Sequence, residues 1–222
     1  MTNFEQQQRR AIVALGARLY QRGLIVAGEG NISIRLDEKR ILATPSGLCK
    51  GELAATDLVV IDPEGRRLEG ELAPSSEIKM HLVCYRERPE IRAVIHAHPP
   101  TCLSLMLAGY GLDRPILAES VVLLGKVPTA PFALPSTREV PESILPFIRQ
   151  TDAVLLDRHG SLTLGTSLTA ALFLLETLEQ VARVYYGALQ VGTVADLPEA
   201  AIRQLTALRR ERYGLSGPFI PF

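Results

Sequence analysis

The stretch Ala93-Val94-Ile95-His96-Ala97-His98-Pro99-Pro100 decides how this chain is interpreted. Its apolar first half contains β-branched residues and is typical of a buried strand, which the two prolines end. Side chains alternate along a strand, so His96 and His98 point to the same side. Two imidazoles directed at one point suggest a metal site. The alternative is a pair of histidines at a strand end that backbone groups or water satisfy.

Length and composition limit the possible classes of protein. The chain has 222 residues, 47% of them hydrophobic, and shows no composition break that would mark a linker. We therefore expect a single domain over residues 1–222 with a sizeable core. Its 24 basic and 24 acidic residues leave no net charge to attract nucleic acid or an anionic membrane. We expect neither partner, and any anionic ligand must be bound locally.

The ends and the cysteines of the chain indicate a cytoplasmic protein. Residues 1–10 are polar and lack the apolar core of a signal peptide, and no apolar run approaches the length of a membrane span. Cys49, Cys84 and Cys102 are widely spaced and form no CxxC pair. They predict neither a disulfide framework nor a thiolate zinc site.

Periodicity predicts an α/β protein in which strands follow one another as an antiparallel meander. Helices are expected where apolar residues recur every three to four positions, and strands where short β-branched runs lie between turns. The expected helices cover residues 4–26, 74–85, 101–108, 136–148, 166–190 and 197–212, and the expected strands cover 32–36, 40–43, 58–61, 68–69, 93–95, 127–133, 153–156 and 161–165.

Three turns of small residues predict a pocket for an anion. Gly30-Asn31 lies in a glycine-rich turn, Ser46-Gly47 in a turn with hydroxyls and free N–H groups, and Ser75-Ser76 at a helix N-terminus. Orphan N–H groups and the helix dipole favour phosphate or carboxylate there. Such neutral donors would hold a phosphate without a lysine. The alternative is that the turns only connect and cap their neighbouring elements.

A third histidine extends the HxH pair. His159 follows the expected strand 153–156, and two strands of one sheet can bring it close to His96 and His98. Three neutral imidazoles leave a divalent cation open positions, as in catalytic rather than structural zinc sites. Such a cation polarises a carbonyl and stabilises the enediolate that forms when a proton or a carbon fragment departs.

Proton transfer beside such a metal needs a carboxylate, and two are candidates. Glu77 follows the serines of the third turn, where it also reads as an acid that complements the helix dipole. Glu119 lies in an apolar stretch and is either paired or functional. One metal, one acid and one phosphate pocket together describe an enzyme that acts on a phosphorylated hydroxy-ketone.

Five motifs in order resemble the class II aldolase/adducin family, particularly L-fuculose-phosphate aldolase and L-ribulose-5-phosphate 4-epimerase. The resemblance runs from about residue 4 to residue 190 and rests on GEGNIS (28–33), TPSG (44–47), SSE (75–77), HAHP (96–99) and RHG (158–160). It implies a three-layer α/β/α sandwich around a mostly antiparallel sheet. It also implies a homotetramer with active sites between subunits.

The resemblance assigns roles to the motif residues. It implies that His96, His98 and His159 bind Zn²⁺, with Mn²⁺ or Co²⁺ as alternatives. It also implies that Glu77 is the catalytic acid/base, which binds the metal as well when substrate is absent. It implies a phosphate pocket formed by Gly30, Asn31, Ser46, Gly47, Ser75 and Ser76.

The implied reaction is reversible cleavage of a phosphorylated ketose similar to L-fuculose 1-phosphate. The products would be dihydroxyacetone phosphate and an aldehyde, formed through a metal-stabilised enediolate. Alternatives on the same scaffold are sugar-phosphate epimerisation or dehydration. A non-catalytic, adducin-like interaction module is a further alternative, but it predicts loss of the histidines, which this chain retains.

Some residues depart from the family pattern. Fuculose aldolases carry a tyrosine after HxH that protonates the aldehyde oxygen, whereas residues 117–120 here read Leu-Ala-Glu-Ser. Arg158 precedes His159 where the family often has Asn, Gln or His. The tail 217–222 is apolar, and we expect the helix and tail of residues 195–222 to lie at a subunit contact.

Overall fold

A computed structural model describes residues 2–222 of the chain, so that Met1 of the polar N-terminal stretch lies outside the described residues. The elements run in the order α1 (Asn3–Gln21), β1 (Asn31–Arg35), β2 (Ile41–Ala43), β3 (Val59–Ile61), β4 (Arg67–Glu69), α2 (Ile78–Glu87), β5 (Ala93–Ala97), α3 (Pro100–Leu107), η1 (Ser120–Leu124), β6 (Thr129–Ala130), α4 (Glu139–Ile148), β7 (Ala153–Leu156), β8 (Gly160–Gly165), α5 (Leu168–Val191) and α6 (Glu199–Glu211).

The strands of this described part form one sheet in the order β4-β3-β2-β1-β5-β8-β7-β6. The edge strand β6 pairs parallel with β7, and the other neighbours pair antiparallel. The expected α/β class with a mostly antiparallel sheet is confirmed. The strand β5, which carries the HxH motif, lies between β1 and β8 in the middle of the sheet.

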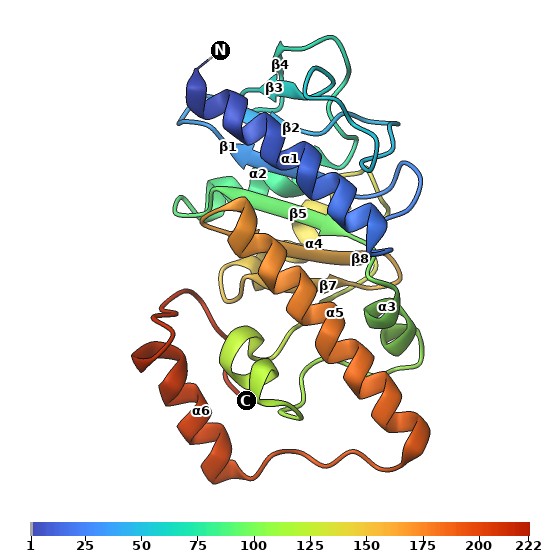
Figure 1. The fold of residues 1–222 in the computed structure, drawn as a ribbon, viewed down its shortest axis with the longest axis vertical. Helices are drawn as coiled ribbons and strands as arrows, with labels where there is room; N and C mark the ends of the chain where they lie inside the picture. The colour runs from blue at the N-terminus through green and yellow to red at the C-terminus, as the bar shows by residue number, and fades with distance from the viewer. Residues whose placement is uncertain (1) are drawn as a thin grey trace.

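Helices cover both faces of the sheet, which makes the three-layer sandwich. Figure 1 shows α1 and α5 crossing one face, and Arg18 of α1 is bonded to Glu176 of α5 at 2.8 and 2.9 Å. The opposite face is covered by α2 and α4. Alternation along β2 supplies both cores: Leu42 packs beneath α1, whereas Ile41 and Ala43 pack beneath α2.

Element boundaries differ from the expected ones where local hydrogen bonds intervene. Helix α1 ends at Gln21, and Gly23 follows with a φ of 66°, as glycine permits. Helix α2 begins only at Ile78, so Glu77 is its N-cap residue rather than part of its first turn. The apolar stretch around Glu119, for which the sequence predicted no helix or strand, contains a short π-helix, η1.

The C-terminal segment packs on η1 of its own chain. Arg209 of α6 donates to the carbonyls of Val122 and Leu123 and lies over the ring of Phe219, 4.3 Å from its centroid. The carbonyl of Ile220 accepts the N–H of Lys126 at 2.8 Å. The apolar tail therefore has an intrachain contact, and its place at a subunit contact stays a prediction. None of the helices in residues 2–222 combines the length and hydropathy of a membrane span.

The loop after β2 rests on α1 through two glycines. A Cβ at Gly16 of α1 would lie 2.1 Å from the carbonyl oxygen of Lys50, and a Cβ at Gly51 would lie 2.6 Å from the ring of Tyr20. Both contacts are too close for a side chain. The absence of side chains at these positions therefore fixes how deeply the loop sits against α1.

The close approach at Gly16 predicts that alanine substitutions at two helix glycines change the free energy of unfolding in opposite directions. Gly16→Ala should lower the free energy of unfolding by about 1–3 kcal/mol, because the backbone of Lys50 must shift. The matched control is Gly187→Ala in α5, where a Cβ meets nothing within 4 Å. That change should raise the free energy of unfolding by about 0.5–1 kcal/mol through helix propensity. Chemical denaturation of both variants measures the difference, and equal effects would contradict the packing described here.

Candidate active site

Three histidines converge at one end of the central strands. His96 lies in β5, His98 follows that strand, and His159 precedes β8, which pairs with β5. The Nε2 atoms of His96 and His98 are 3.0 Å apart, and the ring centroids of His96 and His159 are 4.7 Å apart. One nitrogen from each ring lies within 4.8 Å of the others. The structure thus brings together the three histidines that the sequence singled out.

Two of the rings are oriented through their outer nitrogens. Nδ1 of His96 lies 2.9 Å from the carbonyl oxygen of Ser161, and Nδ1 of His98 lies 3.0 Å from a carboxylate oxygen of Glu29. Such contacts leave Nε2 as the ligand atom and fix the ring. Burial lowers the pKa of His96 to about 3, which keeps the ring neutral at neutral pH. A neutral ring is the form that binds a metal.

Gly160 leaves the space that the rings occupy. A Cβ at this position would lie 2.5 Å from the carbonyl oxygen of Ala97, 2.8 Å from Cδ2 of His98 and 3.0 Å from Cε1 of His96. The residue after His159 must therefore have no side chain. The RHG motif carried this information, although the spacing of the histidines alone did not.

Glu77 completes the cluster from the start of α2. Its Oε2 lies 3.4 Å from Nε2 of His96, and its Oε1 lies 3.2 Å from Nε2 of His159. Burial alone raises the pKa of this carboxyl, but hydrogen bonding to His159 and the electrostatic effect of the neighbouring imidazoles outweigh burial and lower the pKa to about 2. Asn31 donates its amide to Oε2 at 3.2 Å. The carboxylate is ionised and held in place.

These donors fit a divalent cation. Three imidazole nitrogens are the protein ligands of one class of catalytic zinc site, and carboxylate oxygens also bind zinc. Oε1 of Glu77 is buried and lacks an aligned hydrogen-bond donor, so an electron pair is left free beside the nitrogens. The histidine cluster could therefore bind a metal ion.

The cluster opens into a cavity of about 410 Å³. All six residues expected in the phosphate pocket border it, together with Glu77, His98 and His159. Gly30 occurs there with a φ of 67°, and a Cβ would lie 2.9 Å from the carbonyl oxygen of His96. Ser76 accepts a hydrogen bond from Ser136, which borders the same cavity.

The turns around this cavity are tied to one another. The N–H of Ser46 donates to the carbonyl of Ala73 at 3.0 Å, and the N–H of Ser75 donates to the carbonyl of Thr44 at 3.3 Å. The expectation that the second turn offers its N–H groups freely is thus wrong for Ser46. Its hydroxyl and the Gly47 backbone remain exposed. The serine hydroxyls and glycine N–H groups are the donors left for a ligand.

Lys50 also borders the cavity, and sequence reasoning missed it. Its side chain is almost fully buried, and Nζ donates to the carbonyls of Gly28 at 2.7 Å and Leu48 at 2.8 Å. The cavity thus has a lysine at its border in addition to the expected neutral donors. The sequence shows that Lys50 follows the TPSG motif by three residues, but this position alone does not indicate that the side chain is buried.

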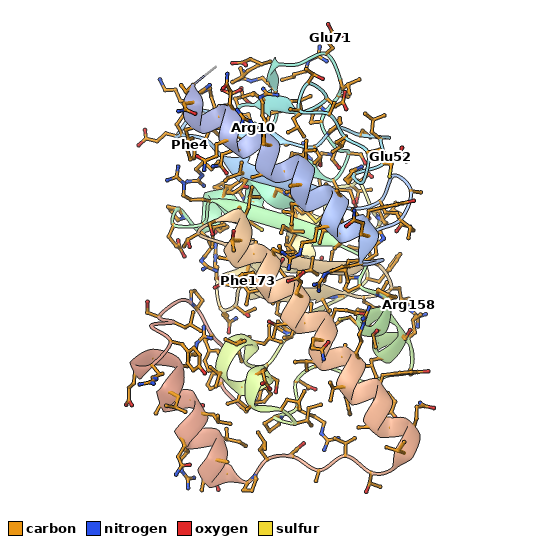
Figure 2. All side chains as sticks on the ribbon, viewed as in Figure 1. Phe4, Arg10, Glu52, Glu71, Arg158 and Phe173 are labelled. Atoms are coloured by element: carbon orange, nitrogen blue, oxygen red, sulfur yellow. The ribbon has the colours of Figure 1, made fainter. Side chains whose placement is uncertain are left out.

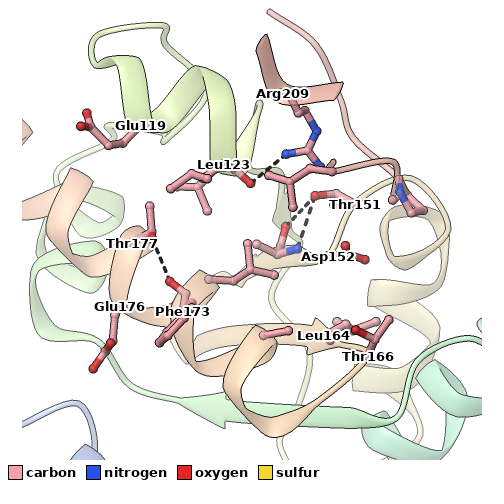
Figure 3. Close-up of a pocket in the computed structure, with 18 of the residues that line it drawn as sticks. Glu119, Leu123, Thr151, Asp152, Leu164, Thr166, Phe173, Glu176, Thr177 and Arg209 are labelled. Carbon is pink, nitrogen blue, oxygen red and sulfur yellow. Dashed lines mark hydrogen bonds between the residues drawn. The ribbon is translucent and has the colours of Figure 1, made fainter. Parts of the chain in front are cut away.

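The second candidate carboxylate, Glu119, lies outside the cavity beside the histidine cluster. It is exposed and borders a larger, mostly apolar cavity of about 980 Å³ between η1, α5 and the C-terminal segment, as Figure 3 shows. No histidine borders that cavity within residues 2–222. Arg158 adopts a φ of 54°, and its exposed side chain lies at the surface near α3 in Figure 2. Neither residue joins the histidine cluster.

A second buried polar group lies behind the cluster. His81 is one turn after Glu77 on α2 and is fully buried, which lowers its pKa to about 3. Its Nδ1 lies 2.7 Å from the hydroxyl of Ser33, which lies 2.7 Å from the hydroxyl of Tyr85. The spacing of Glu77, His81 and Tyr85 at four residues places them on one helix face. The hydroxyl of Ser33 thus links His81 to Tyr85 behind the cluster.

Comparison with known proteins gives consistent matches. The family model for the Class II Aldolase and Adducin N-terminal domain matches residues 10–186. A 3-oxo-tetronate 4-phosphate decarboxylase of Pectobacterium atrosepticum is 36% identical over 82% of this chain and 85% of its own. A 5-deoxy-D-ribulose 1-phosphate aldolase of Bacillus thuringiensis is 33% identical over 94% of this chain and 98% of its own. A solved L-fuculose 1-phosphate aldolase matches with a TM-score of 0.81 and 30% identity, covering 90% of this chain and 94% of its own.

Metal binding should depend on the converging histidines and not on the buried one behind them. His96→Ala should lower the affinity for Zn²⁺ by at least about 10-fold, because one of three nitrogen donors is removed. His81→Gln is the matched control. It removes an equally buried imidazole that does not belong to the cluster, so this variant should retain the metal. Metal content after dialysis and titration with Zn²⁺ measure both. Equal retention in the two variants would contradict the assignment of the site.

Proposed function

The chain belongs to the class II aldolase and adducin family, and on this premise we propose that it is a divalent-metal-dependent lyase that cleaves a carbon–carbon bond beside the carbonyl of a phosphorylated keto sugar. The observation that carries the proposal is the approach of Glu77 to both His96 and His159, at the border of a cavity with small hydrogen-bond donors. In the proposed site, the proton-transfer group, the metal ligands and the phosphate pocket are neighbours.

His96, His98 and His159 are proposed to bind the metal, joined by Glu77 when substrate is absent. Zn²⁺ is the first choice, and Mn²⁺ or Co²⁺ are alternatives. The cation supplies a Lewis acid that draws electron density from the substrate carbonyl. Glu29 and the carbonyl of Ser161 hold the rings of His98 and His96, so the ligand atoms need little rearrangement. The six small residues of the pocket are proposed to hold the phosphate.

Glu77 is proposed as the acid/base. In the condensation direction, its carboxylate removes a proton from the hydroxymethyl carbon of dihydroxyacetone phosphate and leaves an enediolate. In the cleavage direction, the protonated carboxyl returns that proton to the same carbon. The lowered pKa keeps Glu77 ionised and ready to act as a base at neutral pH. The amide of Asn31 fixes one carboxylate oxygen, which orients the other.

The two reactions named for the relatives share this proton step. Retro-aldol cleavage of a 5-deoxyribulose 1-phosphate between C3 and C4 leaves the enediolate of dihydroxyacetone phosphate and releases an aldehyde. Loss of CO₂ from a 3-oxo-tetronate 4-phosphate leaves the same enediolate. A single acid that protonates this carbon therefore serves both reactions, and the departing fragment distinguishes them.

We propose the aldolase reaction on a ketose 1-phosphate, of the kind represented by L-fuculose 1-phosphate, as the activity. The match to a ketose-phosphate aldolase over 94% of this chain supports it. Decarboxylation of a 3-oxo acid phosphate is the second candidate, because a decarboxylase is 36% identical. The lack of a tyrosine in residues 117–120 favours this second candidate. Aldol cleavage must remove the proton of the C4 hydroxyl as the aldehyde leaves, whereas loss of CO₂ from a carboxylate needs no such proton transfer.

Epimerisation, dehydration and a homotetramer with shared active sites remain predictions from the family resemblance. Each would use the same histidine cluster, so the cluster does not choose among them. The retained histidines do argue against a purely structural, adducin-like module, because such a module has no use for three imidazoles directed at one point.

Product analysis decides between the candidate reactions. The Zn²⁺-loaded protein should release dihydroxyacetone phosphate from at least one of L-fuculose 1-phosphate and 5-deoxy-D-ribulose 1-phosphate, with an equal amount of aldehyde. 3-Oxo-tetronate 4-phosphate is run beside them, and CO₂ is measured. L-Ribulose 5-phosphate tests epimerisation. Release of CO₂ together with dihydroxyacetone phosphate from 3-oxo-tetronate 4-phosphate, without aldehyde from either ketose phosphate, would replace the aldolase proposal by the decarboxylase. No dihydroxyacetone phosphate from any substrate would contradict the lyase proposal.

A further inference from the structure

Lys50 has no role in the proton chemistry proposed above, although it borders the same cavity. Its side chain is 2% exposed. An ammonium has three N–H groups, and the hydrogen bonds found within residues 2–222 use two of them, to the carbonyls of Gly28 and Leu48. One N–H group is therefore left for another acceptor.

The charge of Lys50 is not matched by an acid. Within the described part of the chain, no carboxylate forms an ion pair with its Nζ. Burial lowers the pKa of this ammonium, and the negative charge of Glu77 opposes that shift without touching it. A buried cation without a counter-ion is costly for the fold. An anion that enters the cavity would offset this cost.

The backbone around Lys50 packs closely against α1. Gly16 and Gly51 seat it against α1 at distances that no side chain would allow. Its two carbonyl acceptors belong to the loops that carry Gly30 and Gly47, two of the residues expected to bind phosphate. The ammonium thus lies between two of the three small-residue turns.

We propose that Lys50 is a substrate-binding residue whose ammonium neutralises the phosphate group of the substrate. The inference rests on the proposed function, in which a phosphorylated substrate occupies this cavity. Lys50 is the lone lysine or arginine that borders the cavity within residues 2–222. The other donors there are neutral and orient the phosphate, whereas Lys50 supplies the charge. The pocket therefore selects phosphorylated over unphosphorylated ketones.

Binding of inorganic phosphate to the Zn²⁺-loaded chain of residues 1–222 tests this without turnover. Calorimetric titration compares the wild type with Lys50→Gln, which keeps an amide donor for the loop carbonyls but loses the charge, and with Lys50→Arg, which keeps the charge. Lys39→Met removes an exposed lysine as the matched control. Lys50→Gln should weaken phosphate binding by about 10- to 100-fold, as expected for a charge-assisted hydrogen bond. Lys50→Arg should weaken it less, and Lys39→Met by less than about twofold.

Two results would overturn the inference. One is a phosphate affinity of Lys50→Gln equal to that of the wild type. The other is an equal loss in the Arg and Gln variants, because then the loop contacts and not the charge of Lys50 would matter. Failure of the proposed function is distinguishable: phosphate binding that depends on Lys50, in a protein that cleaves no ketose phosphate, contradicts only the lyase activity. Cleavage with phosphate binding indifferent to Lys50 contradicts only this inference.

Discussion

The pairing of β5 with β1 on one side and β8 on the other is the constraint on which the site depends. Antiparallel register sets Asn31 of β1 opposite His96 of β5, and the turn before β8 places His159 beside them. A one-residue slip in either pairing would turn a site side chain to the opposite face of the sheet. The apolar residues of β5 fix that register, because Ile95 must face α1 and α5 whereas Val94 must face α2.

Burial and close neighbours set the protonation states of the polar groups in the site. His96 stays neutral because a charged imidazole would lose its hydration, and Glu77 stays ionised because imidazoles replace the water that it lost. Lys50 is held by two carbonyls and no carboxylate. These groups cost folding free energy that the two apolar cores on either face of the sheet must offset.

Much of this site could be predicted from the sequence because strand and helix periodicities are local. The two-residue spacing of His96 and His98 fixed a shared direction, and the apolar runs before His98 and His159 indicated strand ends. The antiparallel class followed from short turns between strands. The resemblance to a known family, rather than periodicity, supplied the three-layer arrangement and the role of Glu77.

Other parts depend on contacts between distant segments, which a single sequence does not display. Nothing local distinguishes the buried Lys50 from a solvated lysine, since its burial follows from a glycine on α1 that lies 34 positions earlier. Glu119 looked like a buried acid because its neighbours are apolar, but η1 turns it outward to another cavity. The π-helical turn has no sequence signature that would have shown this.

Proton exchange on dihydroxyacetone phosphate tests the central claim, that Glu77 moves the proton beside the histidine cluster. The Zn²⁺-loaded wild type should exchange one hydroxymethyl proton with deuterated water, as followed by NMR. Glu77→Gln should slow this exchange by about 10²- to 10⁴-fold, whereas Glu119→Gln should not. Metal content is measured in the same samples, since three histidines remain in the variant. Exchange by metal-loaded Glu77→Gln at the wild-type rate would contradict the account.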